Sequence, residues 1–337
     1  MAGGTRSILA QSLVVSALPS RVKARTEHEF AYVGTMRPTL GLLVPPPVPQ
    51  ENLARGSLRL RYEDIAQDGS LALSVLSAGL GASVWEKLLA QPAARTMRDR
   101  GEIPILTRLV LAAGEGPISV ADPLHIDGSF RFSHARLPSG EVDRILVEMW
   151  STASAPRGST YGPPSRPDAQ IVTAGRLYAE HVLTRLFAPK EDRKVRRIEL
   201  PSMPEVPEPE VPWVPPAKTA DLLDGARPLG DTTRSRVAFG FTHTDANQHV
   251  NSLVYLRMAE DAALQRLASL GRDTRLVLDT AELAYRKPSF VGDVLSLDLR
   301  AFESTHEGKH RLGVVGGFVD EGKPLEQART FVRLTFR

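Results

Sequence analysis

Two stretches of the chain, residues 71–89 and 252–270, carry the apolar spacing and the helix-forming residues of long α-helices. Each begins directly after a short polar segment and is followed by segments in which apolar and polar residues alternate. Alternation with a period of two is typical of strands that bury one face. The pattern therefore predicts two units, each with one long helix and several strands.

The alternating segments end at glycine, proline or charged residues, which favour turns. They are 103–113, 117–136 and 141–152 in the first unit, and 276–287, 294–302, 310–319 and 328–336 in the second. Residues 239–244 are predicted to be a strand that leads into the second polar segment. Because strands joined by short turns pair antiparallel, we expect an α+β fold with an antiparallel sheet in each unit.

Proline-rich chain separates the two units. Residues 153–170 are rich in Pro, Ser, Gly and Arg, and residues 201–216 are dense in proline, which favours extended chain. Between them, residues 171–187 have helical spacing and predict one connector helix packed on a sheet. We therefore divide the chain into an N-terminal domain over 1–152, a connector over 153–228 and a C-terminal domain over 229–337.

The polar segment before the second helix carries Asp245, Asn247, His249 and Asn251 at alternate positions. A carboxylate, two amides and an imidazole can orient water and move protons. The start of a helix adds unpaired N–H groups and the positive end of the helix dipole, which suit a developing oxyanion. A purely structural interpretation is a polar turn in which Asp245 and Asn251 cap the helix.

In and around this segment the chain resembles the acyl-acyl carrier protein (acyl-ACP) thioesterase family. The second half of that family has a Trp-Ser-Asp-Leu-Asp-Val-Asn-Gln-His-Val-Asn-Asn type motif, then a Tyr, then a strand that begins Glu-Tyr-Arg-Arg-Glu-Cys. The matching residues here are Asp245, Asn247, Gln248, His249, Val250, Asn251, Tyr255, Tyr285 and Arg286. The likeness is clear over residues 239–300 and thinner elsewhere.

The first half of the chain also resembles this family. Residues 61–63, Arg-Tyr-Glu, look like the Arg-x-Tyr-Glu start of the family's first half, and they lead into the first helix. Setting Asp64 against Asp245 places Asp68 opposite His249, with the helix following in both halves. We interpret this as an internal repeat of the motif.

The resemblance implies a tandem (double) hotdog fold, in which two antiparallel sheets are each wrapped on a long central helix. It implies hydrolysis of a fatty-acyl or polyketide-type thioester of coenzyme A or acyl carrier protein, within fatty-acid and lipid metabolism, without a cofactor. Asp245, Asn247 and His249 match the family's catalytic residues, and N–H groups at the helix start would hold the thioester oxygen. Asn251 and Tyr255 are expected to contact the substrate, and the first half to shape the acyl tunnel.

The chain departs from the family after Tyr285. Where the family has its catalytic Glu followed by Cys, this chain has Pro288 and Ser289. Another carboxylate would have to replace that Glu, and the candidates are Asp245 itself, Glu260, Asp261, Glu282 and Asp68. Of these, Glu260 and Asp68 are the two that we expect at the substrate.

Two other functions stay open. Hotdog hydratases and dehydratases act on 3-hydroxyacyl thioesters with a histidine from one half and an acid from the other. This chain would then need His249 and Asp68 in a shared cleft. Non-catalytic binding of acyl thioesters is favoured if Pro288 has removed the base.

Composition narrows the class of protein. The 337 residues are 42% hydrophobic, enough for two sheet-and-helix cores, and no run approaches the roughly 20 apolar residues that span a membrane. The chain has no cysteine, which excludes a thiolate nucleophile, and nothing marks an oxidising compartment, so we expect a cytoplasmic protein. No metal-ligand spacing or glycine-rich phosphate loop stands out, so neither a metal nor a nucleotide cofactor is expected.

The charge pattern bears on partners. A net charge of +3 is too small for a committed nucleic-acid binder but is compatible with docking an acidic carrier protein. Residues 190–197 hold five basic side chains, which could bind the phosphates of coenzyme A or a carrier, or could be a solvated linker. The first 26 residues lack Asp and Glu, and we favour a docked N-terminal segment over a targeting peptide. The protein is expected to be a monomeric pseudo-dimer or a homodimer.

Overall fold

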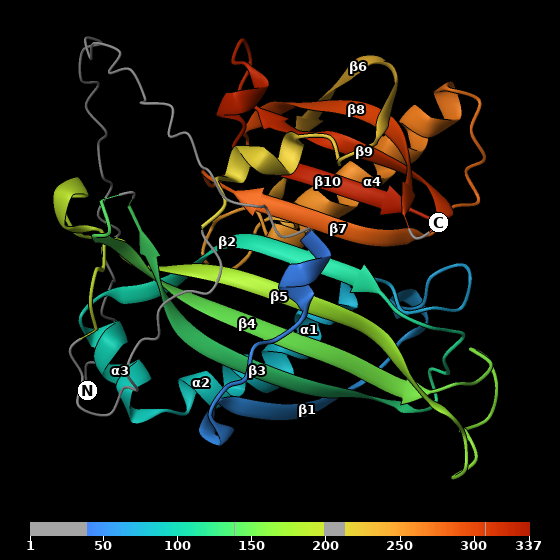
Figure 1. The fold of residues 1–337 in the computed structure, drawn as a ribbon, viewed down its shortest axis with the longest axis horizontal. Coiled ribbons are helices and arrows are strands. Elements are labelled where there is room, and N and C mark those ends of the chain that lie inside the picture. The colour runs from blue at the N-terminus through green and yellow to red at the C-terminus, as the bar shows by residue number, and fades with distance from the viewer. Residues whose placement is uncertain (1–38, 138, 199–212, 307) are drawn as a thin grey trace, which may run out of the picture. The chain divides into compact units, whose positions relative to one another are not determined.

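The described strands form one ten-stranded antiparallel sheet in the order β1-β3-β4-β5-β2-β7-β10-β9-β8-β6 (Figure 1). A computed structural model describes residues 39–137, 139–198, 213–306 and 308–337, all of which belong to one compact unit. The N-terminal segment expected to dock, residues 1–26, lies outside the described residues.

Five strands of the first half wrap a helical segment. The strands are β1 (Leu53–Arg59), β2 (Glu102–Ala113), β3 (Pro123–Arg136), β4 (Val142–Pro156) and β5 (Ile171–Arg185). The helical segment consists of α1 (Val75–Leu80), a π-helical turn (Gly81–Trp85) and α2 (Glu86–Leu89), and α3 (Pro92–Asp99) follows it. Helix α1 contacts β1, β3, β4 and β5, so the first predicted helix is confirmed as the centre of this half.

The second half repeats the arrangement around α4 (Ser252–Ser269). Its strands are β6 (Arg227–Ala238), β7 (Leu278–Tyr285), β8 (Val294–His306), β9 (Lys309–Val319) and β10 (Thr330–Phe336). Helix α4 buries Tyr255, Leu256, Ala259, Ala263 and Leu267, which recur at the spacing of one helix face, against β7, β8 and β10. Burial of this apolar face holds the helix on the sheet.

The two halves join edge to edge, because β2 pairs with β7 from Arg108 opposite Ala284 to Ala112 opposite Thr280. The two sheets that the resemblance implies are therefore one continuous sheet. Because the pair is antiparallel, β2 begins at the end of the sheet where β7 ends. We call this end, marked by Glu102 and Tyr285, the motif end; Leu278 and Ala113 mark the opposite end.

The predicted connector helix over 171–187 is wrong, since these residues form β5 between β4 and β2. The strand buries Val172, Ala174 and Leu177 on one side and Tyr178 on the other. A central strand that is buried on both faces shows no period of two, so its spacing can be mistaken for that of a helix. The sequence also did not indicate β1, β6 or α3.

Short 3₁₀ turns connect the elements. They are Thr39–Leu43, Gln50–Asn52, Tyr62–Asp64, Lys190–Asp192, Pro216–Ala220, Phe241–His243 and Leu325–Gln327. The predicted strand over 239–244 is wrong, because β6 ends at Ala238 and Phe241–His243 form a 3₁₀ turn. Among the described helices, none has the length and apolar character needed to cross a bilayer.

A row of buried charges crosses the face of the sheet that points away from the helices. The facing pairs on neighbouring strands in this row are Arg131 and Glu148, Glu148 and Glu180, Glu180 and Arg108, and Glu282 and Arg333. The connector covers part of the row, because Thr219 donates a hydrogen bond to Glu282 Oε1 (2.9 Å). Arg131 pairs with Glu148 (2.8 Å), and Glu282 pairs with both Arg108 and Arg333, as buried charges require. Glu180 accepts a hydrogen bond from the Thr107 hydroxyl (2.7 Å).

Candidate active site

The polar segment of the second half forms a tight loop between β6 and α4. His243 Nδ1 accepts a hydrogen bond from the Gly240 N–H (3.0 Å), and the His243 carbonyl accepts one from the Asn251 N–H (2.8 Å). The His243 ring also packs edge-on against Phe239. His243 therefore shapes the loop that presents the other polar residues.

Asp245 and Asn247 are exposed on this loop. Asp245 Oδ1 accepts a hydrogen bond from the Asn247 N–H (2.8 Å), which closes a turn within the segment. The second carboxylate oxygen of Asp245 has no hydrogen bond among the described residues. A carboxylate and an amide thus face solvent side by side, where they can orient a water molecule.

Asn251 is the N-cap of α4, because its Oδ1 accepts a hydrogen bond from the Leu253 N–H (3.0 Å). The capping interpretation is therefore confirmed for Asn251, whereas Asp245 closes the preceding turn. Within the described part of the chain the Ser252 N–H makes no hydrogen bond. It is a free donor at the positive end of an 18-residue helix, which favours an anion.

His249 is half-buried and lies against the chain that follows β7. Its ring meets the ring of Phe290 edge-on, with centroids 5.1 Å apart and planes at 77°. The next residue, Val250, donates its N–H to the Ser289 carbonyl (2.8 Å). These contacts fix His249 beside Asp245 and Asn247 at the start of α4.

Tyr255 lies one turn into α4 and is buried, with 2% of its surface exposed. Its hydroxyl lies near those of Ser289 and Thr330, which are buried and make no hydrogen bond in the described chain. Burial raises the pKa of Tyr255. Tyr255 and Ser289, which stands where the family has Cys, therefore form a polar cluster beneath the helix start.

Glu282 is unsuited to replace the missing catalytic Glu. It lies in the buried row of charges on the other face of the sheet, where it pairs with Arg108 and with Arg333 (2.8 Å). Its neighbours in sequence, Ala281 and Leu283, face α4. Because alternate strand residues point to opposite faces, the Glu282 carboxylate points away from the helix start.

Glu260 and Asp261 follow each other on α4, where Glu260 is half-buried and Asp261 is exposed. Burial, and then the nearby charge of Asp261, raise the pKa of Glu260. Arg266 donates to the Asp231 carbonyl of β6 (2.5 Å), and Glu260 lies about 120° around the helix from Arg266. Glu260 therefore points toward the first half, about 13 Å along the axis from Asn251.

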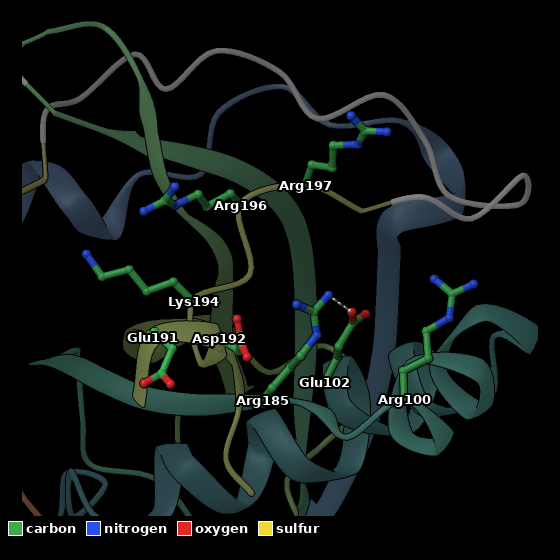
Figure 2. Close-up of a pocket in the computed structure, with 8 residues that line it drawn as sticks. All are labelled: Arg100, Glu102, Arg185, Glu191, Asp192, Lys194, Arg196 and Arg197. Carbon is green, nitrogen blue, oxygen red and sulfur yellow. Dashed lines mark hydrogen bonds and ion pairs between the residues drawn. The ribbon is translucent and has the colours of Figure 1, made fainter. Parts of the chain in front are cut away.

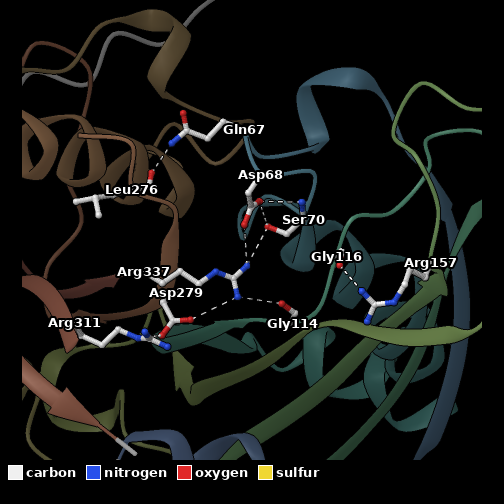
Figure 3. Close-up of polar contacts among 10 residues, drawn as sticks. All are labelled: Gln67, Asp68, Ser70, Gly114, Gly116, Arg157, Leu276, Asp279, Arg311 and Arg337. Carbon is white, nitrogen blue, oxygen red and sulfur yellow. Dashed lines mark hydrogen bonds and ion pairs between the residues drawn. The ribbon is translucent and has the colours of Figure 1, made fainter. Parts of the chain in front are cut away.

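Asp68 lies beside Arg337 (Figure 3), at the opposite end of the sheet from His249. Its carboxylate accepts hydrogen bonds from the Ser70 N–H (2.9 Å) and from Arg337 Nη2 (3.2 Å). Arg337 in turn pairs with Val277, which precedes β7, whereas His249 pairs with chain beyond the end of β7. The length of β7, about 24 Å, separates the two residues.

The charge state of Asp68 reflects this different setting. Partial burial opposes its ionisation, but the hydrogen bonds of Ser70 and the charge of Arg337 outweigh burial and hold the pKa of Asp68 below its ordinary value. A cleft shared by Asp68 and His249 is therefore absent from the described structure, and Asp68 lies away from a substrate at the start of α4.

The internal repeat is real, but its predicted alignment is wrong by two residues. The Ala66 N–H donates to the Ser70 carbonyl (2.8 Å), as the Asp245 N–H donates to the His249 carbonyl (3.1 Å). His249 thus corresponds to Ser70 and not to Asp68. The hydrogen bonds of the backbone turn define how the two halves align. Matching similar side chains predicted a different alignment.

An apolar cavity of about 290 Å³ lies in the first half. It is lined mainly by Trp85, Leu88, Met97, Phe132, Val147 and Leu183, with Ile103 and Pro104 of β2 at the motif end. At Gly79 of α1, a Cβ would come within 2.8 Å of Ile126 on β3. Gly79 therefore allows α1 to pack closely on β3, and the apolar cavity lies farther along the helical segment, beside Trp85.

Among the described residues, no three His, Asp or Glu side chains meet as a metal site would require. No protein-family model and no curated protein matches the sequence. The comparisons that follow are therefore with solved structures.

Three solved structures share the arrangement of this chain, each at 13% sequence identity. A protein described as an oleoyl thioesterase from Lactobacillus plantarum aligns over 85% of this chain and 96% of its own, with a TM-score of 0.56. An acyl-ACP thioesterase from Bacteroides thetaiotaomicron aligns over 86% and 99% with a TM-score of 0.51. The 12:0-ACP thioesterase from Umbellularia californica aligns over 85% and 94% with a TM-score of 0.50. The chain thus shares the hotdog fold of these structures, with the two expected sheets joined into one.

Proposed function

We propose that the protein hydrolyses an acyl thioester to a free acid and a thiol at the start of α4. The observation that supports this most directly is the free Ser252 N–H beside His249, Asp245 and Asn247. A donor that points at a developing oxyanion stabilises the transition state of acyl transfer. The fold shared with thioesterases adds to the proposal.

In the proposed reaction the thioester oxygen accepts a hydrogen bond from the Ser252 N–H. Asp245 and Asn247 orient a water molecule, and His249 takes a proton from it as the new C–O bond forms. Collapse of the tetrahedral adduct breaks the C–S bond, and His249 returns the proton to the departing sulfur. One water is consumed, and no cofactor takes part.

Asp245 is the proposed substitute for the family's Glu, because its second oxygen is open to a water molecule. Asn251 holds the helix start in shape, and Tyr255 supports it from inside the core. Glu260 is assigned to the wall of the substrate site, since it points toward the first half and lies about 13 Å from the cap.

The acyl chain is proposed to occupy the cavity beside Trp85, whose β2 wall lies at the motif end. Fatty-acyl and polyketide-type chains are both apolar enough for such a cavity. The two joined halves already form a pseudo-dimer, so we propose that one chain is sufficient for activity. A cytoplasmic location stays a prediction.

The test is thiol release from acyl-coenzyme A, acyl-carrier and acyl-pantetheine substrates. Wild-type protein should release thiol, and His249→Ala and Asp245→Ala should each lower kcat at least a hundredfold. His125→Ala, a change at an exposed histidine of β3, is the matched control and should leave kcat unchanged. Binding of acyl thioesters without any release would instead favour the non-catalytic alternative.

A further inference from the structure

A second cavity, of about 410 Å³, lies at the motif end and is strongly basic (Figure 2). Its basic residues are Arg100, Arg185, Lys194, Arg196 and Arg197, and they come from three separate segments of the chain. Three acidic residues also line it, so positive charge is in excess. Such a cavity favours an anion.

The chain that carries these residues is anchored to the sheet. Val195 is fully buried, and its carbonyl accepts a hydrogen bond from the Ile145 N–H (2.9 Å). The Arg193 carbonyl accepts one from the Arg185 N–H (2.9 Å). The basic segment is therefore held in place beside the start of β4 and the end of β5, unlike a solvated linker.

Existing ion pairs leave part of the positive charge available. Arg185 pairs with Glu102 (2.7 Å), and Lys194 pairs with Asp143. Arg196 is exposed and makes no hydrogen bond or ion pair within the described residues. A guanidinium without an internal partner is a ready ligand for phosphate oxygens.

An exposed aromatic residue follows Arg185, one of the arginines of this cavity, in the sequence. Phe187, two residues after Arg185, is 90% exposed. Its turn is held by hydrogen bonds from the Ala188 N–H to the Arg185 carbonyl (3.1 Å) and from Arg193 Nε to the Ala188 carbonyl (3.0 Å). A solvent-facing ring on a turn that is held in this way can stack with a nucleobase.

The basic cavity also adjoins the apolar one, because Glu102 lines both. Glu102 begins β2 and therefore lies at the same end of the sheet as the start of α4. Groups for an acyl chain, for a thioester and for phosphates thus share one end of the molecule.

We propose that this basic cavity binds the phosphorylated adenosine of coenzyme A, with phosphate on Arg196 and its neighbours and adenine on Phe187. The assignment to coenzyme A rests on the proposed thioester chemistry. An acyl carrier protein presents a phosphate but no adenine, so the exposed Phe187 favours coenzyme A.

The test is calorimetric binding of adenosine 3′,5′-bisphosphate, which has no acyl group or thioester. Wild-type protein should bind it, Arg196→Glu should weaken binding at least tenfold, and Phe187→Ala about tenfold. Arg275→Glu and Tyr161→Ala change an exposed arginine and an exposed aromatic residue elsewhere and should bind as wild type does. Equal binding by wild type and both cavity variants, or no binding by wild type at millimolar bisphosphate, would overturn the proposal.

Hydrolysis separates this inference from the proposed function. Arg196→Glu should raise KM for acyl-coenzyme A about tenfold, with kcat and the hydrolysis of acyl-pantetheine unchanged. Bisphosphate binding without any thiol release supports the nucleotide cavity and contradicts the thioesterase. Thiol release without bisphosphate binding supports the thioesterase and contradicts the nucleotide cavity. An effect of Arg196→Glu on acyl-carrier substrates alone would assign the cavity to a carrier protein and overturn the inference.

Discussion

Gln248 occupies, in the loop before α4, the position that Gly69 occupies in the loop of the first half. Both have a positive φ, 63° for Gln248 and 81° for Gly69, and the N–H of each donates to the residue three positions earlier (2.9 Å in both). The turn therefore requires a residue with a left-handed backbone conformation. In the first half this residue is glycine, and in the second half it is Gln248, which has a side chain. Strain of this kind is typical of functional sites.

Gln248→Gly should stabilise the fold. A left-handed residue with a Cβ costs about 1–2 kcal/mol, and the greater freedom of glycine in the unfolded chain offsets about half of that gain. The expected increase in the free energy of unfolding is about 0.5–1 kcal/mol by urea denaturation. The same substitution at the exposed helix position Gln265 should destabilise by about 1 kcal/mol. Equal effects at both sites would contradict the strain at Gln248.

Asn251→Ala and Asn247→Ala should separate capping from catalysis. Loss of the Asn251 cap on the Leu253 N–H should lower the free energy of unfolding by about 1 kcal/mol. Asn247 is exposed, so its replacement should change stability by less than about 0.5 kcal/mol while kcat falls. Thermal melts and thiol release on the same samples measure both effects. A stability loss at Asn247 equal to that at Asn251 would refute this division.

The sequence predicted α4 and its Asn251 cap better than it predicted the sheet. Residues 245–251 and the helix after them follow local rules, so Asn251 as a cap and α4 as a helix could be recognised directly. The predicted alignment of Asp68 with His249 is wrong, because a weak sequence repeat does not reveal the backbone hydrogen bonds that align the two halves. The distance between those residues depends on β7 and on its pairing with β2, which no local pattern reveals.

The pairing of the buried charges also could not be predicted from the sequence. Glu282 could be taken for a catalytic acid, since its partners Arg108 and Arg333 lie far away along the chain. Their meeting depends on the register of three neighbouring strands. Likewise β5 could not be distinguished from a helix, because it is buried on both faces.

Glu282→Leu should destabilise the fold by about 3–5 kcal/mol, because it removes the ion-pair partner of two buried arginines. Arg108→Met should cost less, since Glu282 keeps its pair with Arg333 (2.8 Å). Urea denaturation of both variants tests this order. A catalytic role for Glu282 would show instead as a large loss of kcat in Glu282→Gln with stability unchanged.

Stability should depend on pH through His181. This residue is 5% exposed, lies edge-on to Trp85 with ring centroids 5.0 Å apart, and has no hydrogen bond at Nδ1 within the described structure. Burial lowers the pKa of His181 from 6.5 to about 4. The folded protein therefore favours the neutral ring, and between these values the unfolded chain binds the proton more tightly.

The free energy of unfolding should consequently fall as the pH decreases from about 6.5 to about 4, and His181 should have no effect on the pH dependence above that range. The part due to this residue is about 3 kcal/mol over the whole range. His181→Leu should reduce the slope of unfolding free energy against pH in urea denaturation, whereas His125→Leu, at an exposed position, should not. Parallel curves for wild type and His181→Leu would show that the folded protein accepts the charged ring, and hence that the space beside Trp85 is open to water.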